Sequence, residues 1–201
     1  MDKKEIIKQT KLAFSHVHKL YTETSFLIKE IEAQLAEEPE NFVIGKPSGY
    51  SVTSRSSTGL ETRFIYYWPI RKFGVFFVPI DMTTVSGTTN TELKADTKVI
   101  YVRFSLDDDD IKEPIILFGT FYGFGDNKAK NKKFTKVEQL LAHIEYRDKI
   151  ILANPNQIEY EDSYVIFKGK LQKVNLFDIN GSEEVNKQIV QRALDSFRSI
   201  Q

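Results

Sequence analysis

Apolar residues recur at intervals of three and four along residues 1–38, and this spacing predicts one long amphipathic helix. The stripe comprises Ile6, Ile7, Thr10, Ala13, Phe14, Val17, Leu20, Tyr21, Thr24, Leu27, Ile28, Ile31 and Leu35. At about 1.5 Å per residue the helix is on the order of 50 Å long, whereas a compact chain of 201 residues has a radius of gyration of about 16 Å. We therefore expect the helix either to bend near Thr22–Ser25, where helix propensity is low, or to project and require a partner.

The middle of the chain, from Phe42 to about Gly125, has a β pattern. The segment Val99–Ser105 alternates, whereas Phe64–Trp68 and Val75–Val78 are continuous apolar runs that predict central strands covered on both faces, with Trp68 largely buried. The expected strands are 50–55, 61–68, 72–80, 99–105 and 115–124, with a long loop over 82–97 and a turn at Asp107–Asp110.

The last third of the chain predicts a helix, two strands and a second helix. Thr135–Glu138 has the form of a capping box and opens a short helix over 135–146. Strands are expected near Lys149–Ala153 and over Asp162–Phe177, the latter bent or broken at Gly169. Ser182 is expected to be the N-cap of a final helix over 183–199. The apolar stripe of this helix is Val185, Ile189, Val190, Ala193, Leu194, Phe197 and Ile200.

This order of elements predicts a single α+β domain over residues 1–201. Its sheet-rich body, residues 42–179, is expected to hold a mainly antiparallel sheet of five or more strands, because repeated βαβ units are absent from the pattern. The long N-terminal helix and the C-terminal helix are expected to pack over the apolar face of that sheet.

Composition narrows the classes of function. The 28 basic and 28 acidic residues cancel, which argues against attraction of the whole domain to nucleic acid or to an anionic membrane. The chain has no cysteine, which excludes disulfides, thiolate nucleophiles and cysteine-ligated metals. The chain has no apolar run of about 18 residues, the length that could span a membrane. We therefore expect a cytoplasmic protein that does not bind a membrane, and we expect no cofactor.

One short motif suggests chemistry. Pro79-Ile80-Asp81 is followed by Glu92-Leu93-Lys94, which resembles the metal-binding pattern of the restriction-endonuclease-like nucleases. The resemblance implies that Asp81 and Glu92 hold Mg²⁺ and that Lys94 positions the attacking water. In that family the second part of the motif lies on a buried strand, whereas here polar residues flank Glu92-Leu93-Lys94 on both sides. A metal-dependent nuclease is therefore the alternative to the favoured function.

Histidines and lysines offer weaker candidates. His16 and His18 lie about 200° apart around a helix and cannot bind one ion together, and His143 has no nucleophile motif beside it, so no metal site is predicted. Lys128, Lys130, Lys132 and Lys133 follow an aromatic strand, an arrangement that suits nucleic-acid contact. The remainder of the chain adds no basic stripe, and a solvated hairpin is the preferred interpretation.

The favoured function is a non-enzymatic interaction or regulatory domain that assembles through its N-terminal helix. Leu12 and Phe26 share one row of this helix, away from the main stripe. A helix packed on one side only leaves both residues exposed. We therefore expect Leu12 and Phe26 to contact another copy of the chain, in a homo-oligomer, or a different protein partner, while the main stripe faces the sheet.

Overall fold

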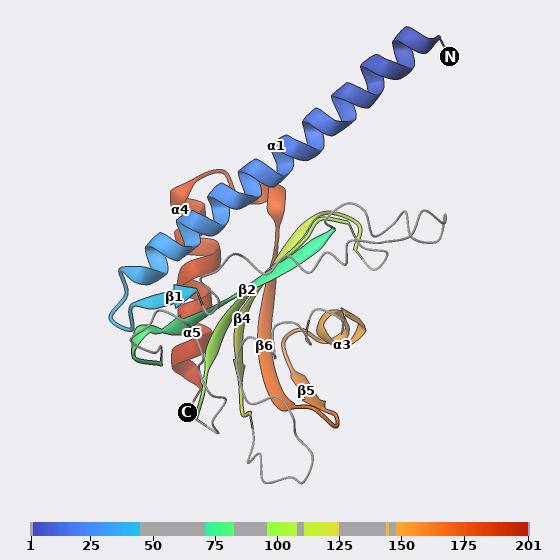
Figure 1. Ribbon diagram of the computed structural model, residues 1–201. Coiled ribbons are helices and arrows are strands. Elements are labelled where there is room, and N and C mark those ends of the chain that lie inside the picture. Colours follow the sequence, from blue (N-terminus) through green and yellow to red (C-terminus); the bar gives the residue numbers. More distant parts are fainter. Residues whose placement is uncertain are drawn as a thin grey trace.

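The computed structural model describes residues 2–44, 71–82, 96–107, 111–124, 144 and 148–200. In this part of the chain, six strands form one sheet in the order β1-β2-β3-β4-β6-β5, with every neighbouring pair antiparallel (Figure 1). The strands are β1 Phe42–Ile44, β2 Lys72–Pro79, β3 Val99–Ser105, β4 Ile115–Tyr122, β5 Ile158–Glu161 and β6 Ile166–Asn175. The predicted α+β fold on an antiparallel sheet is confirmed.

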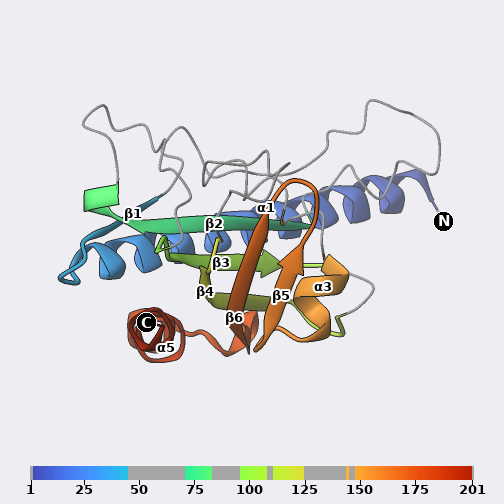
Figure 2. The ribbon, with the colours of Figure 1, turned by 90° about the horizontal axis from the view of Figure 1, so that it is seen from below.

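The helices lie on the two faces of this sheet. They are α1 Lys3–Ala36, α3 Asp148–Ala153, α4 Ser182–Val185, the π-helical turn η4 Asn186–Val190 and α5 Gln191–Ser199, with short 3₁₀ turns η2 Ile80–Met82 and η3 Leu176–Asp178. Helix α1 and the α4–α5 segment contribute to the core on one face, and α3 contributes to the core on the other (Figures 1 and 2). The expectation that both terminal helices cover one apolar face is confirmed.

Both faces of the central strands are buried, which explains their continuous apolar runs. In β3, Ile100, Val102 and Phe104 join the core beneath α1, whereas Val99 and Tyr101 join the core on the side of α3. Strand β2 alternates in the same way and pairs on both edges, with β1 and β3. The prediction that Val75–Val78 forms a central strand is therefore correct.

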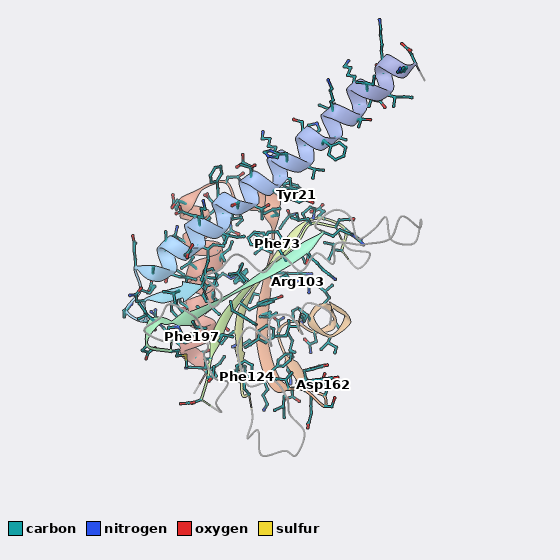
Figure 3. All side chains as sticks on the ribbon, viewed as in Figure 1. Tyr21, Phe73, Arg103, Phe124, Asp162 and Phe197 are labelled. Carbon is teal, nitrogen blue, oxygen red and sulfur yellow. The ribbon has the colours of Figure 1, made fainter. Side chains whose placement is uncertain are left out.

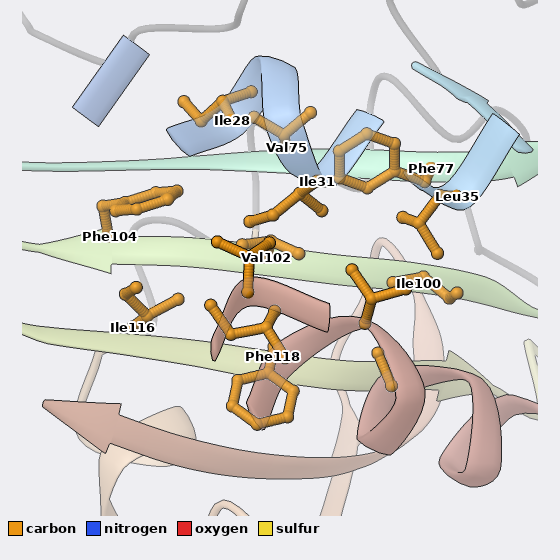
Figure 4. Packing of buried hydrophobic residues seen from close by; sticks show 14 of the residues in the cluster. Ile28, Ile31, Leu35, Val75, Phe77, Ile100, Val102, Phe104, Ile116 and Phe118 are labelled. Atoms are coloured by element: carbon orange, nitrogen blue, oxygen red, sulfur yellow. The ribbon is translucent and has the colours of Figure 1, made fainter. Parts of the chain in front are cut away.

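The C-terminal half of α1 anchors the helix to the sheet. Ile28, Ile31 and Leu35 are buried against the sheet residues that Figure 4 labels, which include Val75 and Phe77. The spacing of three and four residues places these side chains on one side of the helix. The same core continues to α5, where the rings of Phe42 and Phe197 meet edge to face at 5.0 Å between centroids.

Two local predictions in the last third of the chain are wrong. Residues Lys149–Ala153 belong to helix α3, because a short apolar run does not distinguish a strand from a helix segment by its period. Ser182 is the first helical residue and makes no N-cap bond; its hydroxyl instead donates to Glu30. The C-terminal helix also contains a π-helical turn that the spacing did not indicate.

The predicted strand Asp162–Phe177 corresponds to one strand, β6, which begins only at Ile166 and is not broken at Gly169. Asp162 Oδ1 accepts hydrogen bonds from the backbone amides of Tyr164 (2.7 Å) and Val165 (2.9 Å), which forms the turn between β5 and β6. Gly169 lies inside β6, where a Cβ atom would stand 2.6 Å from the Phe121 ring. This glycine therefore provides space for packing and does not interrupt the strand.

Several predictions lie outside the described residues. They concern the strands 50–55 and 61–68 with Trp68, most of the loop 82–97, and the short helix 135–146 apart from Ile144, which is helical and buried.

The end of α5 is fixed to the α1–β1 connection by an ion-pair cluster. Arg198 donates to Glu38 (2.9 Å) and to Glu40 (2.7 Å), and its hydrogen bond to Glu40 lowers the pKa of that carboxyl below 4.5. We expect Arg198→Met to lower the free energy of unfolding at pH 7 by about 1 kcal/mol, because the pair is partly exposed. Denaturant unfolding of both proteins at several pH values measures this.

The pH dependence of that difference has a defined sign. A carboxyl whose folded pKa is lowered contributes stability above its ordinary pKa, and the contribution is lost as the pH falls through the lowered value. The difference between wild type and Arg198→Met should therefore shrink as the pH falls below the ordinary pKa of a glutamate carboxyl. Lys187→Met, which removes another exposed cation of the C-terminal helical segment, should differ from wild type by less than about 0.5 kcal/mol. A difference that does not change with pH would contradict the ion-pair assignment.

Candidate protein-binding surface on helix α1

Helix α1 continues without a break beyond the edge of the domain. The hydroxyl of Thr22 donates to the His18 carbonyl (2.9 Å) and that of Thr24 to the Leu20 carbonyl (2.7 Å), so both are satisfied within the helix. Helix α1 is one α-helix over Lys3–Ala36, and Figure 1 shows no bend at Thr22–Ser25, so the alternative of a bent helix is wrong. Its N-terminal part projects away from the sheet (Figure 1).

The projecting half of α1, residues 2–19, is exposed at every position. Figure 3 shows side chains projecting on both sides of this part of the helix. Five large apolar side chains lie there in contact with solvent, namely Ile6, Ile7, Leu12, Phe14 and Val17. Val17 is one heptad before the buried Thr24 and belongs to the same side of the helix, yet it is 40% exposed. The expectation that the whole stripe faces the sheet is therefore correct for residues 24–35 and wrong for residues 6–17.

A groove begins where α1 leaves the body. It lies between residues 16–30 of α1 and residues 176–185, which comprise the β6–α4 connection and α4, and its volume is about 800 Å³. We call it the α1 groove. Leu20, Leu27 and Ile179 contribute apolar surface to the groove. Two further residues of the lining, Phe26 and Phe177, are 60% and 64% exposed. Such exposed aromatic rings beside an apolar groove are typical of a protein-binding site.

Polar contacts fix one end of the α1 groove. Glu30 accepts hydrogen bonds from the Ser182 hydroxyl and from the Gln34 amide (2.7 Å). Gln34 also donates to the Ser182 carbonyl (3.1 Å) and accepts from Asn186 (3.1 Å). The bond from Ser182, followed by that from Gln34, lowers the pKa of Glu30. Glu30 therefore remains negatively charged at neutral pH at the edge of the groove.

The two halves of α1 carry opposite charge. Residues 2–19 contain five lysines and two acidic residues, for a net charge of +3. Residues 20–38 contain one lysine and five glutamates, for a net charge of −4. Glu23 and Glu30 of the acidic half line the α1 groove. The zero net charge of the whole chain thus hides a strong separation of charge along one helix.

Sequence reasoning located Leu12 and Phe26 but not the groove. Leu12 is 54% exposed and Phe26 is 60% exposed, as expected for residues away from the main stripe. The groove residues Phe177 and Ile179 come from the β6–α4 connection and Ser182 begins α4, segments that approach α1 only in the folded chain. Their one signal in the sequence is the pair Phe177 and Ile179 in a segment otherwise typical of a turn.

Arg103 is a second feature that sequence reasoning missed. Among the described residues it is the charged side chain that is fully buried, and its Nε donates to the Ser105 hydroxyl at 3.1 Å. Arg103 is paired in the sheet with Gly74 of β2, which has no side chain. The signal in the sequence was an arginine within a predicted strand that is otherwise mostly apolar and aromatic.

The other predicted site residues are not brought together in the described structure. Asp81 lies in the exposed turn η2 beside the end of β2. Glu92, Lys94, His143 and the four lysines Lys128, Lys130, Lys132 and Lys133 lie outside the described residues. Within the described ranges, the side chains form no group of three or more histidine or acidic residues suited to a metal ion.

Comparison with protein-family models, with curated proteins and with solved structures finds no match. A search of the described helices for membrane-spanning segments finds none with the necessary length and apolar character.

Proposed function

We propose that this chain is a non-enzymatic protein-interaction domain that binds another protein chain through α1. The observation that carries the proposal is the exposure of five large apolar residues on a helix that continues for about five turns beyond its own domain. A helix segment of this length is marginally stable in water unless its apolar side packs against something. A protein partner would provide that packing.

The shape and chemistry of the site favour a helix as the bound element. The α1 groove follows α1 from His16 to Glu30 and has apolar walls with charged residues beside them. Amphipathic helices bind in such grooves with their apolar side inward. Full burial of one large apolar side chain contributes about 1.5–3 kcal/mol, so several anchors are needed to exceed the entropic cost of association. The projecting half of α1 and the groove together offer that number.

Site-specific photo-crosslinking tests the proposal. A benzophenone amino acid at position 14 or 26 should form covalent adducts with a protein, either in the purified sample or in an extract of the source cells. The same amino acid at position 164 should form none, because Tyr164 lies in the β5–β6 turn, outside the α1 groove and the projecting half. Tyr164 is a matched control because it is also an exposed aromatic residue.

Two results would contradict the proposal. The first is the absence of a protein adduct at positions 14 and 26 in both samples. The second is an equal yield at position 164, which would indicate contact without a defined site. Mass spectrometry of the adducts identifies the crosslinked residues.

A further inference from the structure

We infer that the partner of α1 is the α1 of a second copy of this chain, bound antiparallel, with a two-fold axis passing near Lys19. This inference rests on the proposed function and specifies the partner. In such a dimer the projecting half of each helix lies along the anchored half of the other and fills the other copy's α1 groove. The contact is isologous and closes at two chains.

Charge complementarity favours this occupant. An antiparallel pair places the +3 half of each helix beside the −4 half of the other. A parallel pair would place the two basic halves together and the two acidic halves together. The antiparallel arrangement also aligns the helix dipoles favourably.

The positions of the exposed apolar residues set the register. Leu12 and Phe26 lie seven residues on either side of Lys19, so an axis at Lys19 places Leu12 of one copy opposite Phe26 of the other. Residues seven apart share a side of the helix. The same axis places Lys8 opposite Glu30, since each lies eleven residues from Lys19. Thus the two exposed apolar residues of this row pair with each other, and a lysine meets a glutamate.

The two-fold symmetry also determines where the other exposed apolar residues of α1 lie in the dimer. The two-fold axis of two antiparallel helices is perpendicular to the plane that contains them. The sides of the two helices that face their sheets therefore point in the same direction. Ile6 and Val17 continue the side that carries the buried Thr24 and Ile31. In the dimer they would lie over residues 176–182 of the partner, where Phe177 and Ile179 provide apolar surface.

Cysteine crosslinking tests the arrangement, because the natural chain has no cysteine. Lys19→Cys should form a disulfide-linked dimer on mild oxidation, since the two copies meet at the axis. A mixture of Leu12→Cys and Phe26→Cys proteins should form a mixed dimer. Leu12→Cys alone should not crosslink, because two copies of residue 12 would be about 21 Å apart along the helices, well beyond disulfide reach.

Light scattering of the wild-type protein provides a second test, because it measures the mass of the particle in solution. A dimer mass is expected at low salt, and raising the salt from about 0.05 M to about 0.5 M should increase the dimer Kd by about tenfold through screening. Leu12→Glu with Phe26→Glu should give a folded monomer with an unchanged circular dichroism spectrum. These two residues are exposed in the single chain, so the variant tests association and not folding.

The possible failures are distinguishable. Self-crosslinking of Leu12→Cys without the mixed dimer would indicate a parallel pair and overturn the inference. A monomer at about 100 μM that gives no disulfide at position 19 would also overturn it. The proposed function would still stand in that case if position 14 crosslinked a different protein. Binding of the monomer to anionic vesicles, with no protein adduct at either position, would overturn both the inference and the proposed function.

Discussion

Leu35→Ala is expected to lower the free energy of unfolding by about 2–5 kcal/mol, the range for truncating a buried leucine. Leu35 has no exposed surface and packs in the core that joins α1 to β1 and β2. Its loss would leave a cavity under the anchored half of the helix. Denaturant unfolding followed by far-ultraviolet circular dichroism, in dilute protein, measures the change.

Leu12→Ala is the matched control in the same helix. It removes the same atoms from a side chain that is 54% exposed. The free energy of unfolding in dilute protein should therefore change by less than about 0.5 kcal/mol. Equal effects of the two substitutions would show that the projecting half is packed within its own chain. That outcome would remove the basis for a binding surface on α1.

Gly119→Ala is expected to destabilise the fold by about 2–6 kcal/mol, from backbone strain together with overpacking. Gly119 has a φ of 149°, a backbone conformation that residues with a side chain rarely adopt. An added Cβ atom would stand 2.1 Å from the Lys170 carbonyl oxygen. That oxygen belongs to the backbone of β6, the strand paired with β4, and it has little freedom to move. Thermal unfolding of the purified variant measures the loss.

Gly123→Ala separates the effect of space from that of backbone conformation. Gly123 also has a positive φ, 61°, but its Cβ position is 3.6 Å from the nearest atoms, which belong to the Lys168 side chain. Only the cost of the left-handed conformation applies there, about 1–2 kcal/mol. If Gly119→Ala were no more destabilising than Gly123→Ala, the close approach of β4 to β6 would not be a constraint on this sheet.

Elements whose signal lies in their own residues were predicted correctly. The period of α1 was sufficient to place a helix over nearly the same residues as in the structure, because 34 helical residues repeat the pattern many times. Strands β2, β3 and β4 were located by alternation or by continuous apolar runs. Short segments such as α3 and β5 provide too few residues for a period, and these were assigned wrongly or missed.

The candidate site was predictable only in part, for a physical reason. Leu12 and Phe26 are recognisable because their position on the helix surface depends on spacing within one element. The groove depends on Phe177 and Ile179, more than 140 residues from α1 in the chain. Such proximity is set by the place of β6 in the sheet and by the contact of α4 with α1, and it leaves no periodic trace in the sequence.

By itself, the sequence determined the α+β class, the length of α1, the separation of charge along it and the absence of cysteine chemistry. These properties follow from local spacing and composition. Only the tertiary structure decided that α1 remains straight, that its first half projects from the sheet, and that a groove opens beside Phe26. Each of these depends on which surfaces the sheet covers, and that is decided by contacts between residues distant in the chain.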